Sequence, residues 1–187
     1  MAEGDGSGFH HLGDEVVAEM QRLRIVTARF AAPDGQEFTR DTVRNMGVVA
    51  IVPLLDDGRT VLLVRQYRGP IDSLLLELPA GLRDVEGEAP EACARRELVE
   101  EVGRTAADLS VLATMHPAAG FSDQVVTIYL ATGLAEVPLD RQGPEEQHMT
   151  VEELALHDVP ALIAAGTLTD AKTMVGLLAA REHLGLR

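Results

Sequence analysis

The sequence is poor in the features that link a chain covalently or anchor it in a membrane. Its one cysteine, Cys93, excludes an internal disulfide and any zinc site built from several cysteines. No apolar run is long enough to span a bilayer. The segment Met1–Gly13 lacks the apolar stretch behind a basic one that marks a signal peptide. We therefore expect a cytoplasmic protein that does not associate with membranes.

Positive charge is also scarce, because 16 Lys and Arg residues face 30 Asp and Glu residues, which gives a formal net charge of -14. Nucleic acids and anionic membranes would be repelled at long range, so neither is an expected partner. A phosphate-bearing substrate would need cations held locally, as a bound metal or a few arginines. Aromatic residues make up only 3% of the chain and tryptophan is absent, which leaves few side chains to stack on a base.

The residues that are abundant predict a folded domain. With 187 residues, 46% of them hydrophobic, the chain can bury a core. We predict a flexible tail over residues 1–21 and a single domain over residues 22–187. Strand-like runs dominate, and a helix is predicted over Pro90–Val102, just before Gly103. Two further helices close the chain, so the expected fold class is α+β, in the form of an α/β/α sandwich.

Turn signals divide the strand-rich half of the chain. Pro33-Asp34-Gly35 separates a strand-like run from a returning strand at Phe38–Val43. Asp56-Asp57-Gly58 joins the β-rich runs Gly47–Leu55 and Thr60–Tyr67, which predicts a hairpin.

The most informative segment is the predicted helix. Glu97 and Glu101 are four residues apart and share one helix face, and Arg96 and Glu100 form a neighbouring pair. Two like charges at that spacing destabilise a helix, unless a hard divalent cation such as Mg²⁺ binds both carboxylates. A solvated acidic face with an Arg96–Glu100 ion pair is the alternative interpretation.

The residues around this helix favour the metal. Leu78-Pro79-Ala80-Gly81, an acidic loop and Arg96-Glu97-Leu98-Val99-Glu100-Glu101-Val102-Gly103 together resemble the Nudix box of the Nudix hydrolase superfamily. In that motif Gly81 permits a sharp turn that aims the carbonyl of Ala80 at a metal, and Arg96 braces Glu88 and Glu100. One residue is inserted between Gly81 and Glu88 relative to the family pattern, and a surface loop can absorb it.

A second stretch points to one branch of the superfamily. Val64-Arg65-Gln66-Tyr67-Arg68, followed by Leu76–Gly81, resembles the ADP-ribose pyrophosphatases. This resemblance implies the Nudix fold, a mixed β-sheet with an N-terminal antiparallel strand extension, here residues 22–46. It also implies a homodimer formed through those strands. The implied reaction is Mg²⁺-dependent hydrolysis of ADP-ribose to AMP and ribose 5-phosphate.

The same resemblance assigns roles to individual residues. Ala80 (through its carbonyl), Glu97 and Glu101 would bind Mg²⁺, or Mn²⁺ in its place, with Glu100 nearby as a further ligand or catalytic group. The general base would come from the acidic loop after the box, at Glu145 first and Glu146 second; a merely solvated loop is the competing interpretation. The substrate-binding candidates are Arg40, Arg65, Arg68, Glu77, Phe121, Ser122 and Asp123. Among these, Arg65 suits a structural ion pair equally well, and Arg40 would reach the nucleotide across the dimer.

Two residues depart from the branch pattern and keep other functions open. Ala119 stands where a proline is expected, and Gln124 stands where a glutamate is common. The lost proline loosens a loop that shapes the sugar pocket, and the lost carboxylate removes either a ribose acceptor or a metal-associated group; the metal helix is intact. The alternatives are a hydrolase of another nucleotide sugar, of NADH or FAD, or of a dinucleoside polyphosphate, and a non-catalytic nucleotide sensor. The sensor would show a damaged metal helix, whereas Glu97, Glu100 and Glu101 are all present.

Overall fold

The computed structural model describes residues 7–141 and 147–186. Contacts divide the chain into two compact units, and the single domain over residues 22–187 stays a prediction. The N-terminal unit holds the chain up to Met46 together with Ala118–Gln124, and the main unit holds Gly47–Pro117 and the chain from Val125 onward. The predicted strand extension, residues 22–46, falls in the N-terminal unit.

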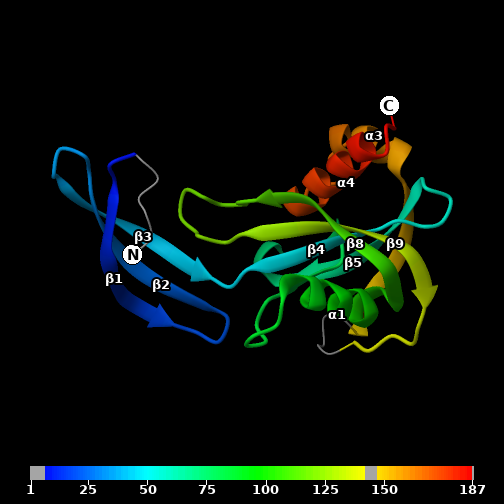
Figure 1. The fold of residues 1–187 in the computed structure, drawn as a ribbon, viewed down its shortest axis with the longest axis horizontal. Coiled ribbons are helices and arrows are strands. Elements are labelled where there is room, and N and C mark those ends of the chain that lie inside the picture. The colour runs from blue at the N-terminus through cyan, green and yellow to red at the C-terminus, as the bar shows by residue number, and fades with distance from the viewer. Residues whose placement is uncertain (1–6, 142–146, 187) are drawn as a thin grey trace. The chain divides into compact units, whose positions relative to one another are not determined.

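The N-terminal unit is an antiparallel sheet of three strands in the order β1-β2-β3 (Figure 1). The strands are β1 (His10–Glu19), β2 (Leu23–Ala31) and β3 (Glu37–Asn45). Strands β2 and β3 meet at the predicted turn, where Gly35 has a φ of 84°. Phe30 on β2 stacks on Phe38 of β3, with ring centroids 5.4 Å apart.

Strand β1 places His10–Glu19 in the sheet, within the segment 1–21 for which a flexible tail was predicted. It pairs with β2 from His10↔Ala31 to Glu19↔Arg24, with two irregularities, between His11 and Gly13 and between Val16 and Ala18. Each bulge shifts the side-chain alternation by one residue, so the period of two that marks a strand is lost in the sequence.

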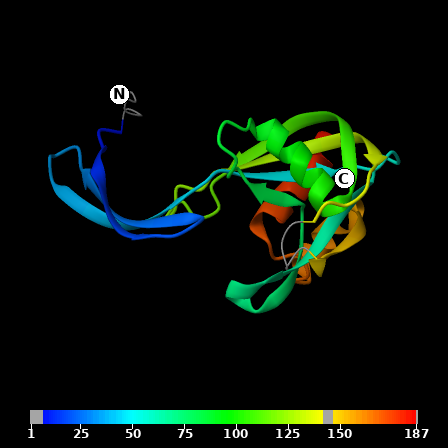
Figure 2. The ribbon, with the colours of Figure 1, turned by 90° about the horizontal axis from the view of Figure 1, so that it is seen from below.

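The main unit contains two further sheets, and together they place α1 and α4 on opposite sides (Figures 1 and 2). The first has the order β7-β4-β9-β8, in which only the β4–β9 pair is parallel, and the second has the order β10-β5-β6. The strands are β4 (Val48–Pro53), β5 (Thr60–Arg68), β6 (Ser73–Glu77), β7 (Ala80–Leu82), β8 (Arg104–Met115), β9 (Val126–Glu136) and β10 (Thr150–Ala155). The helices are α1 (Pro90–Val102), α3 (Val159–Ala164) and α4 (Ala171–His183), with short 3-10 turns at Gly69–Ile71 and Leu156–Asp158.

Alternation along the central strands creates two hydrophobic cores. On β4, Val49 and Ile51 pack in a cluster with Leu98 of α1, whereas Ala50 and Val52 pack in a cluster with Leu177 of α4. Because successive strand residues point to opposite faces, one strand serves both cores. The predicted mixed sheet and α/β/α layering are confirmed. Among the described residues, no helix is long and apolar enough to cross a membrane.

The predicted hairpin between the runs Gly47–Leu55 and Thr60–Tyr67 is wrong in its pairing. The turn is present, and Asp57 accepts hydrogen bonds from the backbone of Arg59 and Thr60. The strands then separate, because β4 pairs with β7 and β9 while β5 pairs with β6 and β10. The two runs are linked at the turn by one isolated bridge, Leu54↔Val61, and by a hydrogen bond from the backbone N–H of Leu55 to the carbonyl of Thr60.

Candidate active site

Helix α1 presents the predicted carboxylates on the edge of its buried face. It begins with Pro90 at its first turn and ends at Gly103, whose φ of 62° suits a glycine. Its apolar buried side chains are Cys93, Ala94, Leu98 and Val102. Glu97 and Glu101 are buried beside them, 7% and 4% exposed. Burying two carboxylates on adjacent turns is costly unless each is paired, so the contacts of Glu97 and Glu101 matter for the stability of this region.

The turn after β6 meets this face of the helix. The backbone N–H of Ala80 donates to Oε2 of Glu101 at 2.9 Å. A Cβ added to Gly81 would lie 1.9 Å from the carboxyl carbon of Glu97. Gly81 is part of β7 and pairs with Val49, so its role differs from the predicted sharp turn. A side chain is absent at Gly81 because the Glu97 carboxylate occupies that space.

Arg96 gathers three carboxylates, and the predicted brace is present. Its guanidinium donates to Glu88 at 3.1 Å, to Glu97 at 2.7 Å and to Glu100 at 3.0 Å. The hydrogen bonds with Glu88 contribute most to raising the pKa of Arg96 above its usual range, and the charges of Glu97 and Glu100 add to it. The same hydrogen bonds lower the pKa of Glu88. The inserted residue between Gly81 and Glu88 therefore does not prevent Glu88 from reaching Arg96.

The oxygen donors of this region fit a hard divalent cation. Glu97 and Glu101 are buried carboxylates on one helix face, and Ala80, whose carbonyl is the third predicted ligand, already contacts Glu101. Mg²⁺ and Mn²⁺ prefer such oxygen ligands. Within the described ranges, no group of three or more His, Cys, Asp or Glu side chains is gathered as a metal site.

A second charged cluster adjoins the helix and includes a residue that sequence reasoning missed. Nε and Nη2 of Arg68 donate to the two carboxylate oxygens of Glu77 at 2.6 and 2.7 Å. Lys172 of α4 also donates to Glu77. Burial would raise the pKa of Glu77, but Arg68 and Lys172 outweigh it and hold the pKa below its usual range. Glu77 raises the pKa of Arg68, and the charge of Glu101 adds to that rise.

One signal in the sequence could have singled out Lys172, because it is the only lysine among the 16 basic residues. Glu77, a predicted substrate contact, is 1% exposed in this structure and pairs with two cations, Arg68 and Lys172. Its contact with the substrate stays a prediction.

Arg65 forms the structural ion pair that was its alternative interpretation. Its Nε and Nη2 donate to Glu152 of the neighbouring strand β10 at 2.5 and 2.9 Å. Glu152 contributes most to raising the pKa of Arg65, and the same pairing lowers the pKa of Glu152. This bidentate pairing takes two of the three guanidinium nitrogens of Arg65, and a contact of Arg65 with the substrate stays a prediction.

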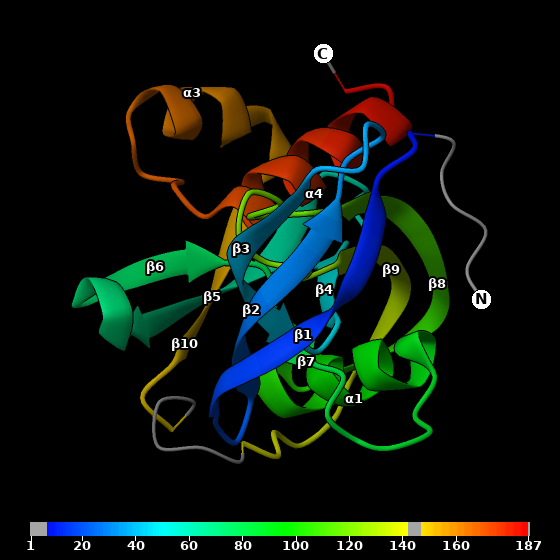
Figure 3. The same ribbon diagram turned by 90° about the vertical axis from the view of Figure 1, so that its left-hand side faces the viewer.

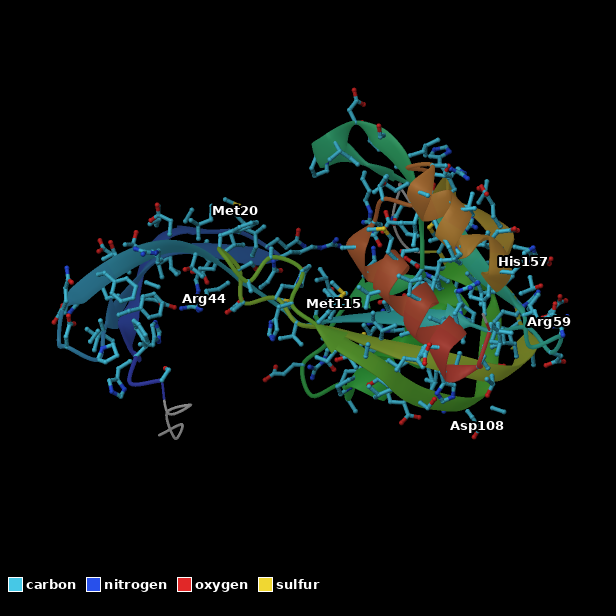
Figure 4. All side chains as sticks on the ribbon, turned by 90° about the horizontal axis from the view of Figure 1, so that it is seen from above. Met20, Arg44, Arg59, Asp108, Met115 and His157 are labelled. Atoms are coloured by element: carbon cyan, nitrogen blue, oxygen red, sulfur yellow. The ribbon has the colours of Figure 1, made fainter. Side chains whose placement is uncertain are left out.

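The other predicted substrate residues belong to the N-terminal unit. Phe121 is 59% exposed, and the guanidinium of Arg40 lies over the Phe38 ring, 4.9 Å from its centroid. Ser122 accepts a hydrogen bond from the backbone N–H of Gln124. Asp123 acts as a structural partner, since it accepts from the backbone of Asn45 at 2.8 Å and pairs with Arg44, which is labelled in Figure 4. The predicted bases Glu145 and Glu146 lie outside the described residues.

Comparison with known proteins identifies the family. A family model described as the NUDIX domain matches residues 44–174, and the chain belongs to that family of hydrolases. It is 42% identical over 179 residues to the ADP-ribose pyrophosphatase of Mycobacterium tuberculosis, covering 96% of this chain and 84% of that one. It is 35% identical over 141 residues to the ADP-ribose pyrophosphatase of Bacillus subtilis, covering 75% of each.

A solved structure is similar over nearly the whole chain. The crystal structure of an ADP compounds hydrolase matches with a TM-score of 0.81 and 27% identity, covering 95% of this chain and 94% of that one. The resemblance inferred from the sequence motifs is thus confirmed, and with it the Nudix fold.

Proposed function

We propose that this protein hydrolyses the diphosphate bond of ADP-ribose to give AMP and ribose 5-phosphate, with Mg²⁺ or Mn²⁺ as its cofactor. The observation that carries the proposal is the meeting of the Ala80-Gly81 segment with Glu97 and Glu101 on α1. The two relatives named ADP-ribose pyrophosphatase support the choice of substrate.

Glu97 and Glu101, with the carbonyl of Ala80 and with Glu100 close by, would hold the metal. When bound, the metal would neutralise charge on the diphosphate and lower the pKa of a bound water. Arg96 orients the ligands, since it contacts both Glu97 and Glu100. Glu145, with Glu146 as second choice, remains our proposal for the base that accepts the proton of that water.

Arg68 is our proposed contact for the substrate's phosphate oxygens. Glu77 takes Nε and Nη2 of its guanidinium, so the Nη1 edge is the part that can donate to an anion. The chain has a net charge of -14, so an anionic substrate needs a cation at its binding site. Arg68, whose pKa is raised in part by the charge of Glu101, supplies one. We retain Phe121 as the candidate for stacking on adenine, because its exposed ring lies next to Ser122 in the loop proposed to bind substrate.

Homodimerisation through the N-terminal strands also remains a proposal. Three apolar residues of β1, namely Leu12, Val16 and Val17, are 43%, 50% and 65% exposed in the single chain. Apolar groups gathered on one strand favour burial against a partner. In such a dimer Arg40 would act on the nucleotide held by the other copy.

The proposal is tested with a substrate panel. ADP-ribose, ADP-glucose, GDP-mannose, NADH, FAD and a dinucleoside polyphosphate are each incubated with the protein, with and without Mg²⁺, and products are separated by chromatography. We expect ADP-ribose to be converted to AMP preferentially and only with the metal. Tight nucleotide binding without turnover of any panel member would instead identify a sensor.

A second candidate is the hydrolysis of another nucleotide sugar. The observation that favours it is the pair Ala119 and Gln124 in the loop proposed to contact the sugar. Preferential turnover of ADP-glucose or GDP-mannose in the same panel would support this candidate and overturn ADP-ribose as the substrate.

A further inference from the structure

Lys172 lies in the first turn of α4 and is the only lysine in the sequence. Its ammonium group donates to Glu77 at the end of β6. It also donates, at 3.0 Å, to Asp170, the N-cap residue of α4. Its side chain is only 13% exposed. Removing one partner from such a buried pair leaves an uncompensated charge, which makes these contacts strongly coupled.

Glu77 extends this coupling to Arg68. Both oxygens of the Glu77 carboxylate accept from Arg68, and one of them, Oε2, also accepts from Lys172. A planar carboxylate held at a fixed angle imposes that angle on a guanidinium bound in the two-bond arrangement. The orientation of Arg68, and so of its Nη1 edge, therefore depends on where Lys172 holds Glu77.

The same turn of α4 also binds Leu78, the residue after Glu77. The hydroxyl of Thr173 accepts from the backbone N–H of Leu78 at 2.8 Å, and it donates to Asp170 at 2.6 Å. At Gly176 an added Cβ would lie 2.6 Å from a methyl group of Leu78, so α4 approaches this segment closely. Figure 3 shows β6 running toward α4. The helix thus holds the chain immediately before the Ala80-Gly81 segment.

We propose that Lys172 is a positioning residue for diphosphate binding: it holds the Glu77 carboxylate, and Glu77 holds Arg68 in the orientation that meets the substrate's phosphate oxygens. This inference rests on the proposed function, because it needs Arg68 to contact the substrate. Without Lys172, Arg68 is the one remaining cation of this cluster that pairs with the buried carboxylate of Glu77. Arg68 is then drawn toward the carboxylate, and its contact with a nucleoside diphosphate weakens.

Three variants of the full chain test the proposal. Lys172→Met removes the ammonium group and keeps the apolar stem, Lys172→Arg keeps the charge, and Arg95→Met removes a cation paired with Glu91 elsewhere on α1. For each, kcat and KM for ADP-ribose are measured with Mg²⁺, the Kd for ADP-ribose is measured by calorimetry in EDTA, and the Tm is recorded. The calorimetric Kd needs neither metal nor turnover.

We expect Lys172→Met to raise KM and Kd about tenfold while kcat falls less than about threefold, since a lost binding contact acts on ground and transition states alike. Lys172→Arg should recover most of this loss, and Arg95→Met should match the wild type. A folded Lys172→Met variant with wild-type KM and Kd overturns the proposal. A purely structural role, which also overturns it, would lower Tm and leave the KM and Kd of the folded variant unchanged.

If Lys172→Met does not fold, the double variant Glu77→Gln with Lys172→Met removes the buried charge together with its partner. The same rise in KM and Kd is expected, and wild-type values there overturn the proposal. Failure of the proposed function is distinguishable, because it is seen in the wild type: a wild-type protein that neither hydrolyses nor binds ADP-ribose overturns both. A wild type that does both, beside an unaffected Lys172→Met, overturns the Lys172 role alone.

Discussion

The backbone N–H of Ala80 donates a 2.9 Å hydrogen bond to Oε2 of Glu101, which ties the start of β7 to the last turn of α1. Both residues are proposed metal ligands. Their contact means that the segment and the helix are assembled by the fold itself, so a metal would have little backbone to order on binding.

Replacing Glu101 with Gln should abolish Mg²⁺-dependent turnover and leave the fold intact. The amide oxygen can still accept from Ala80, but it lacks the charge that a divalent cation needs. We expect a loss greater than the 10- to 100-fold typical of residues that only orient a metal ligand, on the order of 1,000-fold. Turnover and Tm are measured beside Glu91→Gln, an exposed carboxylate in the first turn of the same helix. Wild-type rates in Glu101→Gln would show that Glu101 is not a metal ligand.

Gly81→Ala should damage the same site by a different route. Its Cβ would overlap the Glu97 carboxyl group at 1.9 Å, so Glu97 must leave its position. We expect turnover to be lost together with about 1–3 kcal/mol of stability, the usual cost of overpacking. Gly69→Ala is the matched control, because a Cβ added at Gly69 would lie 4.0 Å from its nearest neighbour, a ring carbon of Tyr67. Equal behaviour of the two variants in turnover and urea denaturation would contradict this role of Gly81.

The ion pair between Asp14 and Arg44 should make the N-terminal sheet sensitive to acid. Hydrogen bonds from Arg44 lower the pKa of Asp14 from 3.8 to about 2. A carboxyl with a lowered folded pKa stabilises the protein above its unfolded pKa, and this contribution disappears as the pH falls from about 4 to about 2. Allowing for solvent screening of a partly exposed pair, we expect about 1 kcal/mol at pH 7.

The measurement is the free energy of unfolding of wild type and Asp14→Asn at pH 7 and pH 3. Their difference should shrink by about half at the lower pH. If this difference in unfolding free energy does not change with pH, the Asp14 charge is not what stabilises β1. If the two proteins have the same unfolding free energy, the result favours the flexible tail predicted from the sequence.

Glu145→Gln should lower kcat more than it raises KM, because a base acts in the transition state. Steady-state kinetics of this variant and of Glu146→Gln, each with ADP-ribose and Mg²⁺, decide between the neighbours. If Glu146→Gln is the impaired variant, the assignment moves by one residue; if neither is impaired, the base lies elsewhere.

Much of the site could be predicted from the sequence because its key pattern is local. Glu97, Glu101 and Arg96 lie within one helix, where a fixed spacing determines which side chains share a face. Gly81 was also identified, but its reason was not, since the proximity of the Glu97 carboxylate is a tertiary contact.

The features that sequence reasoning missed depend on distant pairing. Lys172 meets Glu77 across 95 residues, and Arg65 meets Glu152 across 87. The turn at Asp56-Asp57-Gly58 is a local property and was predicted. The pairing partners of β4 and β5 depend instead on how the strands pack in the two hydrophobic cores, which is a tertiary property. Strand β1 was missed because its bulges interrupt the alternation that reveals a strand.

The most direct test of the central claim follows the products of ADP-ribose hydrolysis in water enriched in ¹⁸O. We predict equal amounts of AMP and ribose 5-phosphate, formed only with Mg²⁺ or Mn²⁺, with one ¹⁸O atom from solvent in the phosphate of one product. Release of ADP and ribose, or hydrolysis that continues in EDTA, would contradict metal-dependent cleavage of the diphosphate bond.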